Sequence, residues 1–191
     1  MNITSAEFIK GIRGADPLVY DGVSQAAFVG RSNVGKSSLI AAVTRRNNLV
    51  KVSKTPGKTT EINFFHINRK FYLVDLPGYG YARVNPAEKE KLKKLIIWYL
   101  TEANIRPKIV VLVLDVKAGV TTFDEQMMEI LRDQQHPFVV VVNKTDKLTK
   151  KDLATQLKNI REAAGDAEVI TTCAVKAGGA NDLLKKLSDF I

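Results

Sequence analysis

The segment Gly30-Arg31-Ser32-Asn33-Val34-Gly35-Lys36-Ser37 carries the strongest signal in this chain. It consists of a glycine, four residues and Gly-Lys-Ser, which is the spacing of a phosphate-binding loop (P-loop). The apolar run Ala26–Val29 before it favours a strand, and Lys36–Thr44 after it favours a helix. The glycines let backbone N–H groups turn toward phosphate oxygens at the positive end of that helix. We expect Lys36 to pair with β- and γ-phosphates and Ser37 to place its hydroxyl on Mg²⁺.

Strand-like and helix-like segments alternate along the rest of the chain. The other expected strands are Ile62–Ile67, Phe71–Asp75, Ile109–Asp115, Phe138–Val142 and Glu168–Thr171. The other expected helices are Ala87–Ala103, Phe123–Asp133, Lys151–Ala164 and Ala180–Phe190. This alternation predicts a three-layer α/β fold around a mostly parallel six-stranded sheet, with ligands at the C-terminal strand ends. No linker or repeat interrupts it, so we expect a single domain over 1–191, with 1–24 as an N-terminal extension packed on it or leading into it.

Composition excludes several classes of protein. The chain has 191 residues, two histidines and one cysteine, so it offers neither an internal disulfide nor a Cys-rich zinc site. His66 and His136 are too isolated for a metal cluster. The longest apolar runs are far shorter than a membrane span, and there is no signal-peptide pattern. We therefore expect a soluble, cytoplasmic protein with no membrane partner.

The charge is strongly positive and unevenly distributed. The net charge is +9, and the segment from Val23 to Thr60 contains seven basic residues and no acid. Such a field favours a phosphate polyanion as partner. Ordinary solubilising lysines are the alternative, and charge alone does not choose RNA over DNA.

A second motif, Asp75-Leu76-Pro77-Gly78, stands at the end of the expected strand Phe71–Asp75. The Asp75 carboxylate at that strand end is well placed to bind Mg²⁺ through a water molecule. Gly78 can bring its N–H close to a γ-phosphate because no Cβ intervenes. An Asp-x-Pro-Gly turn alone is commonplace, but its position after the P-loop favours the nucleotide site.

A third motif, Asn143-Lys144-Thr145-Asp146, selects the base. Guanine presents two adjacent N–H donors, which the Asp146 carboxylate can accept together, whereas adenine leaves that carboxylate unpaired. A site built on such a pattern discriminates strongly. Lys144 would lay its methylene stem over the purine, and Asn143 would tie this loop to the P-loop. GTP or GDP is thus the expected ligand.

Together these motifs resemble a Ras-like G domain of the P-loop NTPase class. Within that class the chain is similar to the EngB (YihA/YsxC) family of ribosome-biogenesis GTPases. The resemblance rests on Ser53-Lys54-Thr55-Pro56-Gly57-Lys58-Thr59 running into Asn63-Phe64-Phe65, and on Asp75-Leu76-Pro77-Gly78-Tyr79-Gly80-Tyr81-Ala82. It covers nearly the whole chain, without an appended domain. It implies a bacterial protein that assists assembly of the large ribosomal subunit, with precursor rRNA and ribosomal proteins as partners.

The resemblance also implies further site residues. Thr59 becomes the switch I threonine whose hydroxyl reaches Mg²⁺, within a nucleotide-contacting loop Gly57, Lys58, Thr59, Thr60 and Glu61. The last base-contacting turn falls at Thr172-Cys173-Ala174, although Cys173 is also consistent with a small buried apolar side chain. Arg83, Lys89, Lys91, Lys93 and Lys94 follow switch II and either touch rRNA or form a solvated face. Trp98 is expected in the helix core rather than in a partner groove.

Hydrolysis is expected to be slow. Many G domains place a glutamine after the Asp-x-x-Gly turn to orient the attacking water, but this chain has Tyr79 there. Catalysis would then rest on Mg²⁺, Lys36, Thr59 and the Gly78 N–H. Asn33 suggests K⁺ as a substitute for an arginine finger, by analogy with related GTPases.

Three functions remain open at this point. The first is a GTP-dependent switch in ribosome assembly, acting as a monomer with no DNA partner. The second is a binding module in which hydrolysis is incidental. The third is a GTP-regulated switch that acts on a protein partner in cell division, or septation.

Overall fold

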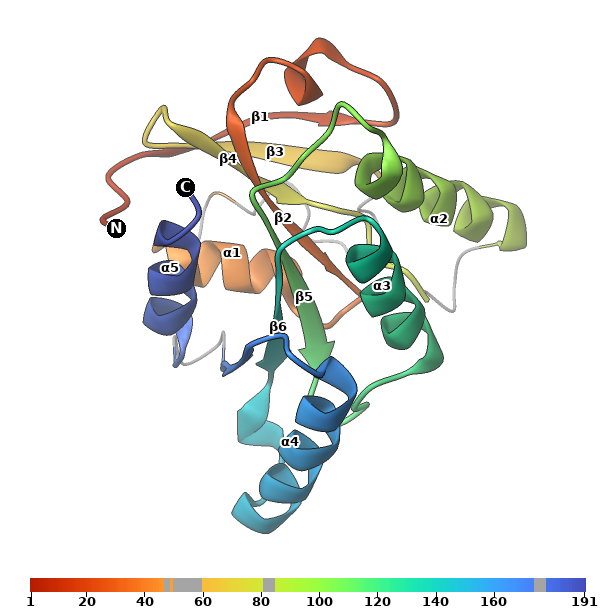
Figure 1. The fold of residues 1–191 in the computed structure, drawn as a ribbon. Helices are drawn as coiled ribbons and strands as arrows, with labels where there is room; N and C mark the ends of the chain where they lie inside the picture. The colour runs from red at the N-terminus through yellow and green to blue at the C-terminus, as the bar shows by residue number, and fades with distance from the viewer. Residues whose placement is uncertain (47–48, 50–59, 81–84, 174–177) are drawn as a thin grey trace.

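A seven-stranded sheet with helices on both faces forms the molecule (Figure 1). The structure is a computed structural model, which describes residues 1–46, 49, 60–80, 85–173 and 178–191. The strand order is β1-β3-β4-β2-β5-β6-β7, and β3 is antiparallel to both of its neighbours while the other pairs are parallel. The expected three-layer α/β class is confirmed.

The strands and helices fall close to the ranges expected from sequence. The strands are β1 (Ala6–Ile12), β2 (Ser24–Gly30), β3 (Ile62–Ile67), β4 (Phe71–Asp75), β5 (Ile109–Asp115), β6 (Phe138–Asn143) and β7 (Val169–Thr171). The α-helices are α1 (Lys36–Thr44), α2 (Pro86–Thr101), α3 (Thr122–Asp133), α4 (Lys150–Ala164) and α5 (Ala180–Ser188). Two short 3₁₀ helices are η1 (Pro17–Val19) and η3 (Thr145–Lys147). Within these described parts of the chain, no helix is long and apolar enough to cross a membrane.

Two apolar layers hold the helices to the sheet. Val110 and Leu112 of β5 belong to the layer that packs under α2, α3 and α4, whereas Val111 and Val113 belong to the layer under α1 and α5. Figure 1 shows the same division, with α1 and α5 on one face of the sheet. Alternate side chains of one strand therefore serve opposite faces, as expected for a parallel strand buried on both sides.

The helix starts are of two kinds. Asn85 caps α2 by accepting a hydrogen bond from the Glu88 N–H at 2.8 Å, and Thr149 caps α4 through the Asp152 N–H at 3.2 Å. In contrast, α1 begins after Gly35 with no side-chain cap, as α5 does after Gly179. The first-turn N–H groups of α1 thus keep their capacity to bind an acceptor from outside the helix.

The sheet has seven strands rather than the expected six, and the additional strand is β1. It pairs antiparallel with β3, from Ala6 opposite Ile67 to Ile12 opposite Ile62. Its residues from Glu7 to Lys10 are exposed and its register shifts between Phe8 and Lys10, so it lacks the alternation that marks a half-buried strand. The N-terminal extension 1–24 therefore contributes β1 and η1 to the fold.

Candidate functional site

The loop between β2 and α1 can only be built with its two glycines. Gly30 has φ 152° and Gly35 has φ 101°, both in the region that side chains disfavour. A Cβ on Gly30 would overlap the Val113 carbonyl oxygen, and one on Gly35 would overlap the Asn143 side-chain amide. The loop is therefore packed directly against β5 and against the loop that follows β6.

The Lys36 side chain reaches back across the P-loop to its first residue, Gly30. Its Nζ donates a hydrogen bond to the Gly30 carbonyl oxygen at 3.1 Å, and the side chain is buried. Burial lowers the pKa of Lys36, and the nearby Asp75 carboxylate partly opposes that effect. A buried ammonium of this kind is favourably placed to bind an anion that enters the loop.

Asp75 and Ser37 meet beneath the loop because β2 and β4 are parallel neighbours, with Phe28 opposite Asp75. The Ser37 hydroxyl donates to Asp75 Oδ2 at 2.7 Å. Burial raises the pKa of Asp75, while Lys36 and the Ser37 hydrogen bond lower it in part. Among the described residues, the buried Asp75 Oδ1 has no hydrogen-bond partner. A hydroxyl beside an unpartnered carboxylate oxygen fits a hard divalent cation, which prefers oxygen ligands.

The turn after β4 is docked on the P-loop. The Ser32 N–H donates to the Tyr79 carbonyl at 2.8 Å, and the Ser32 hydroxyl donates to the Gly78 carbonyl at 3.1 Å. A Cβ on Gly78 would lie 2.7 Å from Ser32 Cα, so only glycine permits this approach. Leu76 and Pro77 are buried and anchor the turn, with the Leu76 N–H donating to the Phe28 carbonyl.

Tyr79 faces away from the P-loop. Its hydroxyl donates to Asp124 Oδ1 at 2.6 Å, and Asp124 Oδ2 accepts from the Thr121 hydroxyl and N–H at the start of α3. Burial first, and then the Asp124 carboxylate, hold the pKa of Tyr79 well above its usual value. The hydroxyl is therefore a poor base at neutral pH and links the turn to α3. Arg31 pairs with Tyr79 through a backbone bridge.

Asn143, at the end of β6, joins the third motif to the P-loop. Its Nδ2 donates to the Val34 carbonyl at 2.8 Å, and its Oδ1 accepts from the Thr172 hydroxyl at 3.3 Å. Asn143 is 2 % exposed, so these hydrogen bonds lie in the core of the site. The three segments 30–37, 143–146 and 172–173 are thus brought together as the sequence analysis expects.

Lys144 crosses between the same loops. Its backbone is left-handed, with φ 63°, and its Nζ donates to the Asn33 carbonyl at 2.6 Å and to Asp115 Oδ2 at 2.7 Å. Asp115 was not singled out in the sequence, because an acid at a strand end has no distinctive spacing. The ion pair leaves the Lys144 stem lying along this edge of the sheet.

Asp146 has a hydrogen bond from Cys173. The Cys173 thiol donates to Asp146 Oδ1 at 3.1 Å, and Lys147 Nζ lies 3.5 Å from Oδ2. These contacts, the Cys173 hydrogen bond above all, lower the pKa of Asp146. Thr145 donates to the Thr172 carbonyl through its N–H and hydroxyl. Cys173 is buried as a small apolar residue would be, and it is also a polar neighbour of Asp146.

Several expected site residues lie outside the residues that the structure describes, and others lie next to such a gap. Gly57, Lys58, Thr59 and Ala174 fall outside the described residues, as do Tyr81, Ala82 and Arg83. Thr60 is described, and its hydroxyl accepts from Arg13 at 3.3 Å. Glu61 pairs with the same guanidinium at 3.1 Å. Arg13 was missed in the sequence because its partners lie almost fifty residues away.

The two histidines and the tryptophan contact other parts of the fold. His136 Nε2 lies 2.6 Å from the Leu100 carbonyl oxygen, and the His66 ring packs at 4.9 Å from Tyr72. In the part of the chain that the structure covers, no three His, Cys, Asp or Glu side chains form a metal-binding group. Trp98 is partly buried; it packs on the core as expected and also lines a cavity.

Comparison with protein families gives two matches. Residues 25–144 match the family described as "50S ribosome-binding GTPase". Residues 102–191 match the family described as "Elongation factor Tu GTP binding domain". The first match contains the P-loop, the Asp75–Gly78 turn and the start of the third motif.

Curated relatives extend the similarity to the full length. A "Probable GTP-binding protein EngB" from Clostridium kluyveri is 44% identical over 197 residues, covering 100% of this chain and 98% of the relative. The protein of the same name from Chlorobaculum parvum is 41% identical over 191 residues, covering 100% and 99%. The one from Aquifex aeolicus is 42% identical over 163 residues, covering 85% and 88%.

Solved structures share the fold. A crystal structure of a probable GTP-binding protein EngB superposes with a TM-score of 0.73 at 24% identity, covering 88% of this chain and 98% of the other. Era in complex with MgGDPNP and a fragment of 16S ribosomal RNA superposes with a TM-score of 0.68 at 21% identity, covering 88% and 56%.

Proposed function

Because this chain belongs to the EngB family of GTP-binding P-loop GTPases, we propose that it is a nucleotide switch in assembly of the large ribosomal subunit. The observation that carries the proposal is the joined site, in which the Asn143 amide bonds to Val34 of the P-loop. One bound nucleotide can then contact the P-loop and the base loop at the same time. Binding or loss of the nucleotide would therefore change the contacts of both loops.

The phosphates would lie in the P-loop, against residues Gly30, Arg31, Ser32, Asn33, Val34, Gly35, Lys36 and Ser37. The uncapped first turn of α1 offers N–H donors, and the Lys36 ammonium offers a buried positive charge. Ser37 and Asp75 fit Mg²⁺, with Asp75 acting through water, and Thr59 would complete the site. When bound, Mg²⁺ neutralises charge on the phosphates and on the transferred group.

The base would lie between Lys144 and the 172–173 turn. The Asp146 carboxylate, whose pKa the Cys173 hydrogen bond lowers, would accept the two N–H groups of guanine. The Lys144 stem, fixed by its bonds to Asn33 and Asp115, would cover one face of the purine. Thr145, Thr172 and Ala174 would complete the wall of the pocket.

Hydrolysis would be slow because Tyr79, directly after Gly78, offers no side-chain amide to orient the attacking water. The Tyr79 hydroxyl is bonded to Asp124 and does not face the P-loop. Lys36, Thr59 and the Gly78 N–H would stabilise the charge that develops on the phosphoryl group. We expect the ribosomal partner to accelerate the reaction, and K⁺ beside Asn33 to assist it. Equal GTPase rates in KCl and in NaCl would dismiss the role of K⁺.

The switch would operate through the two loops that meet the γ-phosphate. Gly78 accepts a hydrogen bond from the Ser32 hydroxyl, and Thr59 to Glu61 precede β3 in the sequence. Loss of the γ-phosphate would release both loops and change the surface offered to the partner. The protein would act as a cytoplasmic monomer.

Co-sedimentation with precursors of the large ribosomal subunit tests the proposal. We expect the protein to bind these particles with a non-hydrolysable GTP analogue and to leave them with GDP. Lys36→Ala should lose both nucleotide and particle binding. Failure to sediment in every nucleotide state would contradict the ribosomal role, and normal GTP affinity of Lys36→Ala would contradict the site.

Two alternatives predict different outcomes. If hydrolysis is incidental, GTP and its analogue give identical release from the particle. If the partner is a protein of cell division, binding is insensitive to salt between 50 and 200 mM, whereas phosphate contacts weaken steeply in that range. The net charge of +9 supports the nucleic-acid partner.

A further inference from the structure

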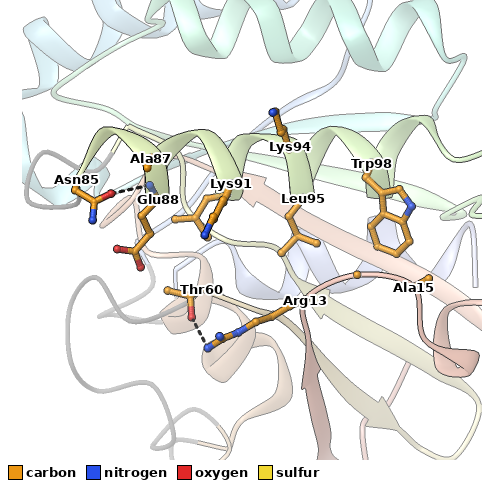
Figure 2. A pocket seen from close by; sticks show the side chains of 12 residues that line it. Arg13, Ala15, Thr60, Asn85, Ala87, Glu88, Lys91, Lys94, Leu95 and Trp98 are labelled. Carbon is orange, nitrogen blue, oxygen red and sulfur yellow. Dashed lines mark hydrogen bonds between the residues drawn. The ribbon is translucent and has the colours of Figure 1, made fainter.

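A cavity separate from the P-loop lies between α2 and the segment that follows β1. Its volume is about 650 Å³, within the usual range of ligand pockets. Figure 2 shows α2 along one side and Arg13 and Ala15 along the other, with Thr60 near the end where α2 begins. The cavity thus opens beside the exit of the segment expected to be switch I.

The walls of this cavity combine an aromatic ring, apolar side chains and charges. The Trp98 ring and Leu95 extend from α2 toward Ala15 and Arg13 (Figure 2). Lys91 and Glu88 point from the same helix face into the cavity, whereas the Lys94 ammonium points away from it. An aromatic platform with cations at its edge is the combination that single-stranded nucleic acids bind.

We propose that this cavity binds a segment of single-stranded RNA, an inference that rests on the proposed ribosomal function. One base would stack on Trp98, and the flanking phosphates would lie against Lys91 and Arg13. The Glu88 carboxylate, which would repel a phosphate, would accept a hydrogen bond from an exocyclic amine of the base. Arg13, Lys91 and Glu88 would therefore each have a partner in the same ligand, whereas Lys94 points away from it.

Charge favours RNA over a protein as the occupant. Lys91 and Arg13 are the cations that line the cavity beside Trp98, and the chain carries a net charge of +9. An acidic peptide would match these cations but leave the flat face of Trp98 without a specific role. In an RNA duplex the bases are already stacked, so only unpaired bases can reach the ring.

Arg13 connects the cavity to the nucleotide-dependent part of the site. Its guanidinium binds Glu61 Oε1 at 3.1 Å and the Thr60 hydroxyl at 3.3 Å, directly after the expected switch residue Thr59. A phosphate that approaches Arg13 competes with these acceptors. RNA binding and the placement of the switch I exit are thereby coupled, so RNA affinity differs between the GTP and GDP states.

Trp98 is the only tryptophan of the chain, so its fluorescence reports on the cavity directly. The probe is a ten-nucleotide oligoadenylate, which lacks guanine and so does not compete for Asp146. We expect saturable quenching of Trp98 emission that weakens with salt and differs between a GTP analogue and GDP. A blunt RNA duplex should quench weakly. Binding seen by anisotropy without quenching, or equal quenching in both nucleotide states, would overturn the proposal.

Two variants and a matched control separate stacking from charge. Trp98→Leu should weaken binding of a labelled oligoadenylate about tenfold or more, measured by anisotropy. Lys91→Gln should lower the salt slope by about 0.7, as for one lost phosphate contact on a single strand. Lys158→Gln makes the same charge change on an exposed site of α4 and should leave the slope unchanged. Equal effects of the two glutamines would contradict the cavity, even if Trp98→Leu does not fold.

Co-sedimentation with ribosomal precursors distinguishes failure of this inference from failure of the proposed function. If the wild-type chain binds the particles and the Lys91→Gln variant binds them with unchanged affinity and salt slope, only the RNA cavity is wrong. If the wild-type chain binds no particle in any nucleotide state, the ribosomal function itself is wrong.

Discussion

At the scale of single residues, the site depends on side chains that connect loops rather than on isolated donors. The Asn143 amide lies so close to Gly35 that a Cβ there would overlap it, and the same amide bonds to Val34. A substitution at either position therefore disturbs both the phosphate and the base ends of the site. Even a conservative substitution at Gly35 or Asn143 is therefore expected to affect the whole nucleotide site.

The Cys173 hydrogen bond lowers the pKa of Asp146, which gives a prediction about pH. Only the ionised carboxylate accepts both N–H groups of guanine, so GTP affinity falls as the pH drops through the pKa of Asp146. The Cys173 thiol is the main cause of the lowered pKa. Cys173→Ala raises that pKa, and the loss of affinity then begins at a higher pH.

Fluorescence titration with a labelled guanine nucleotide from pH 7 to below pH 3 measures this shift, because the pKa of Asp146 is lower than that of an ordinary aspartate. Cys173→Ser keeps a hydroxyl donor and serves as the control, with a smaller displacement than Cys173→Ala. Circular dichroism at each pH establishes that the fold persists. Superimposable pH profiles for the wild type and Cys173→Ala would show that the thiol does not act on Asp146.

At the scale of elements, sequence patterns predicted the central strands well. The bounds of β3, β4 and β5 agree with the expected ranges. Strands β4 and β5 are continuous apolar runs that end in an aspartate, whereas β3 is rich in aromatic and β-branched residues but contains Asn63 and His66. Because these strand ends were predicted correctly, the positions of the motif residues at those ends could be predicted as well. Arg13, Asp115 and Asp124 could not be predicted, because their partners lie far away in the chain and no local spacing marks them.

The missed strand β1 is integral to the sheet, and a pair of isoleucines tests this. Ile12 is 5% exposed and packs in the core, whereas Ile9 is 41% exposed at the register shift. Ile12→Ala should lower the free energy of unfolding by about 2–5 kcal/mol because it leaves a cavity. Ile9→Ala should change it by less than about 0.5 kcal/mol. Urea unfolding measures both, and equal small losses would mean that β1 is only loosely attached.

The link between the turn after β4 and α3 gives a prediction about Tyr79. Tyr79→Phe leaves the buried Asp124 Oδ1 without the hydroxyl donor, which should lower the free energy of unfolding by about 1–3 kcal/mol. The intrinsic GTPase rate should fall less than tenfold, because the hydroxyl is not the base. Tyr20→Phe, at an exposed tyrosine, is the control for unfolding. A GTPase rate reduced a hundredfold would instead assign Tyr79 to the chemistry.

At the scale of the whole molecule, the nucleotide site joins distant parts of one sheet. The hydrogen bond from Asn143 to Val34 spans 109 residues, and it lies at the C-terminal edge of β2 and β6. One apolar layer packs under α2, α3 and α4, and the other packs under α1 and α5. A ligand that contacts both loops therefore stabilises contacts of high sequence separation, and the stabilisation is global rather than confined to one loop.

Thermal unfolding with different nucleotides measures this global effect. A ligand at a hundred times its Kd stabilises the folded state by about 2.7 kcal/mol, which for a chain of this size raises the Tm by about 5–10 °C. We expect that rise with GTP or GDP and Mg²⁺, and no rise with ATP, because adenine leaves the Asp146 carboxylate unpaired. Asp146→Ala should abolish the rise with GTP while changing the ligand-free Tm little, since, among the described side chains, the carboxylate contacts only the Cys173 thiol and the exposed Lys147 side chain.

Asp133→Ala removes an exposed carboxylate at the end of α3 and is the matched control, with the full GTP-dependent rise. If ATP raised the Tm of the wild type as much as GTP does, Asp146 would not select the base. If GTP still raised the Tm of Asp146→Ala by the full amount, the stabilisation would come from the phosphates in the P-loop alone. The base loop would then be stabilised only through the hydrogen bond from Asn143 to Val34 of the P-loop, and it would not bind the nucleotide itself.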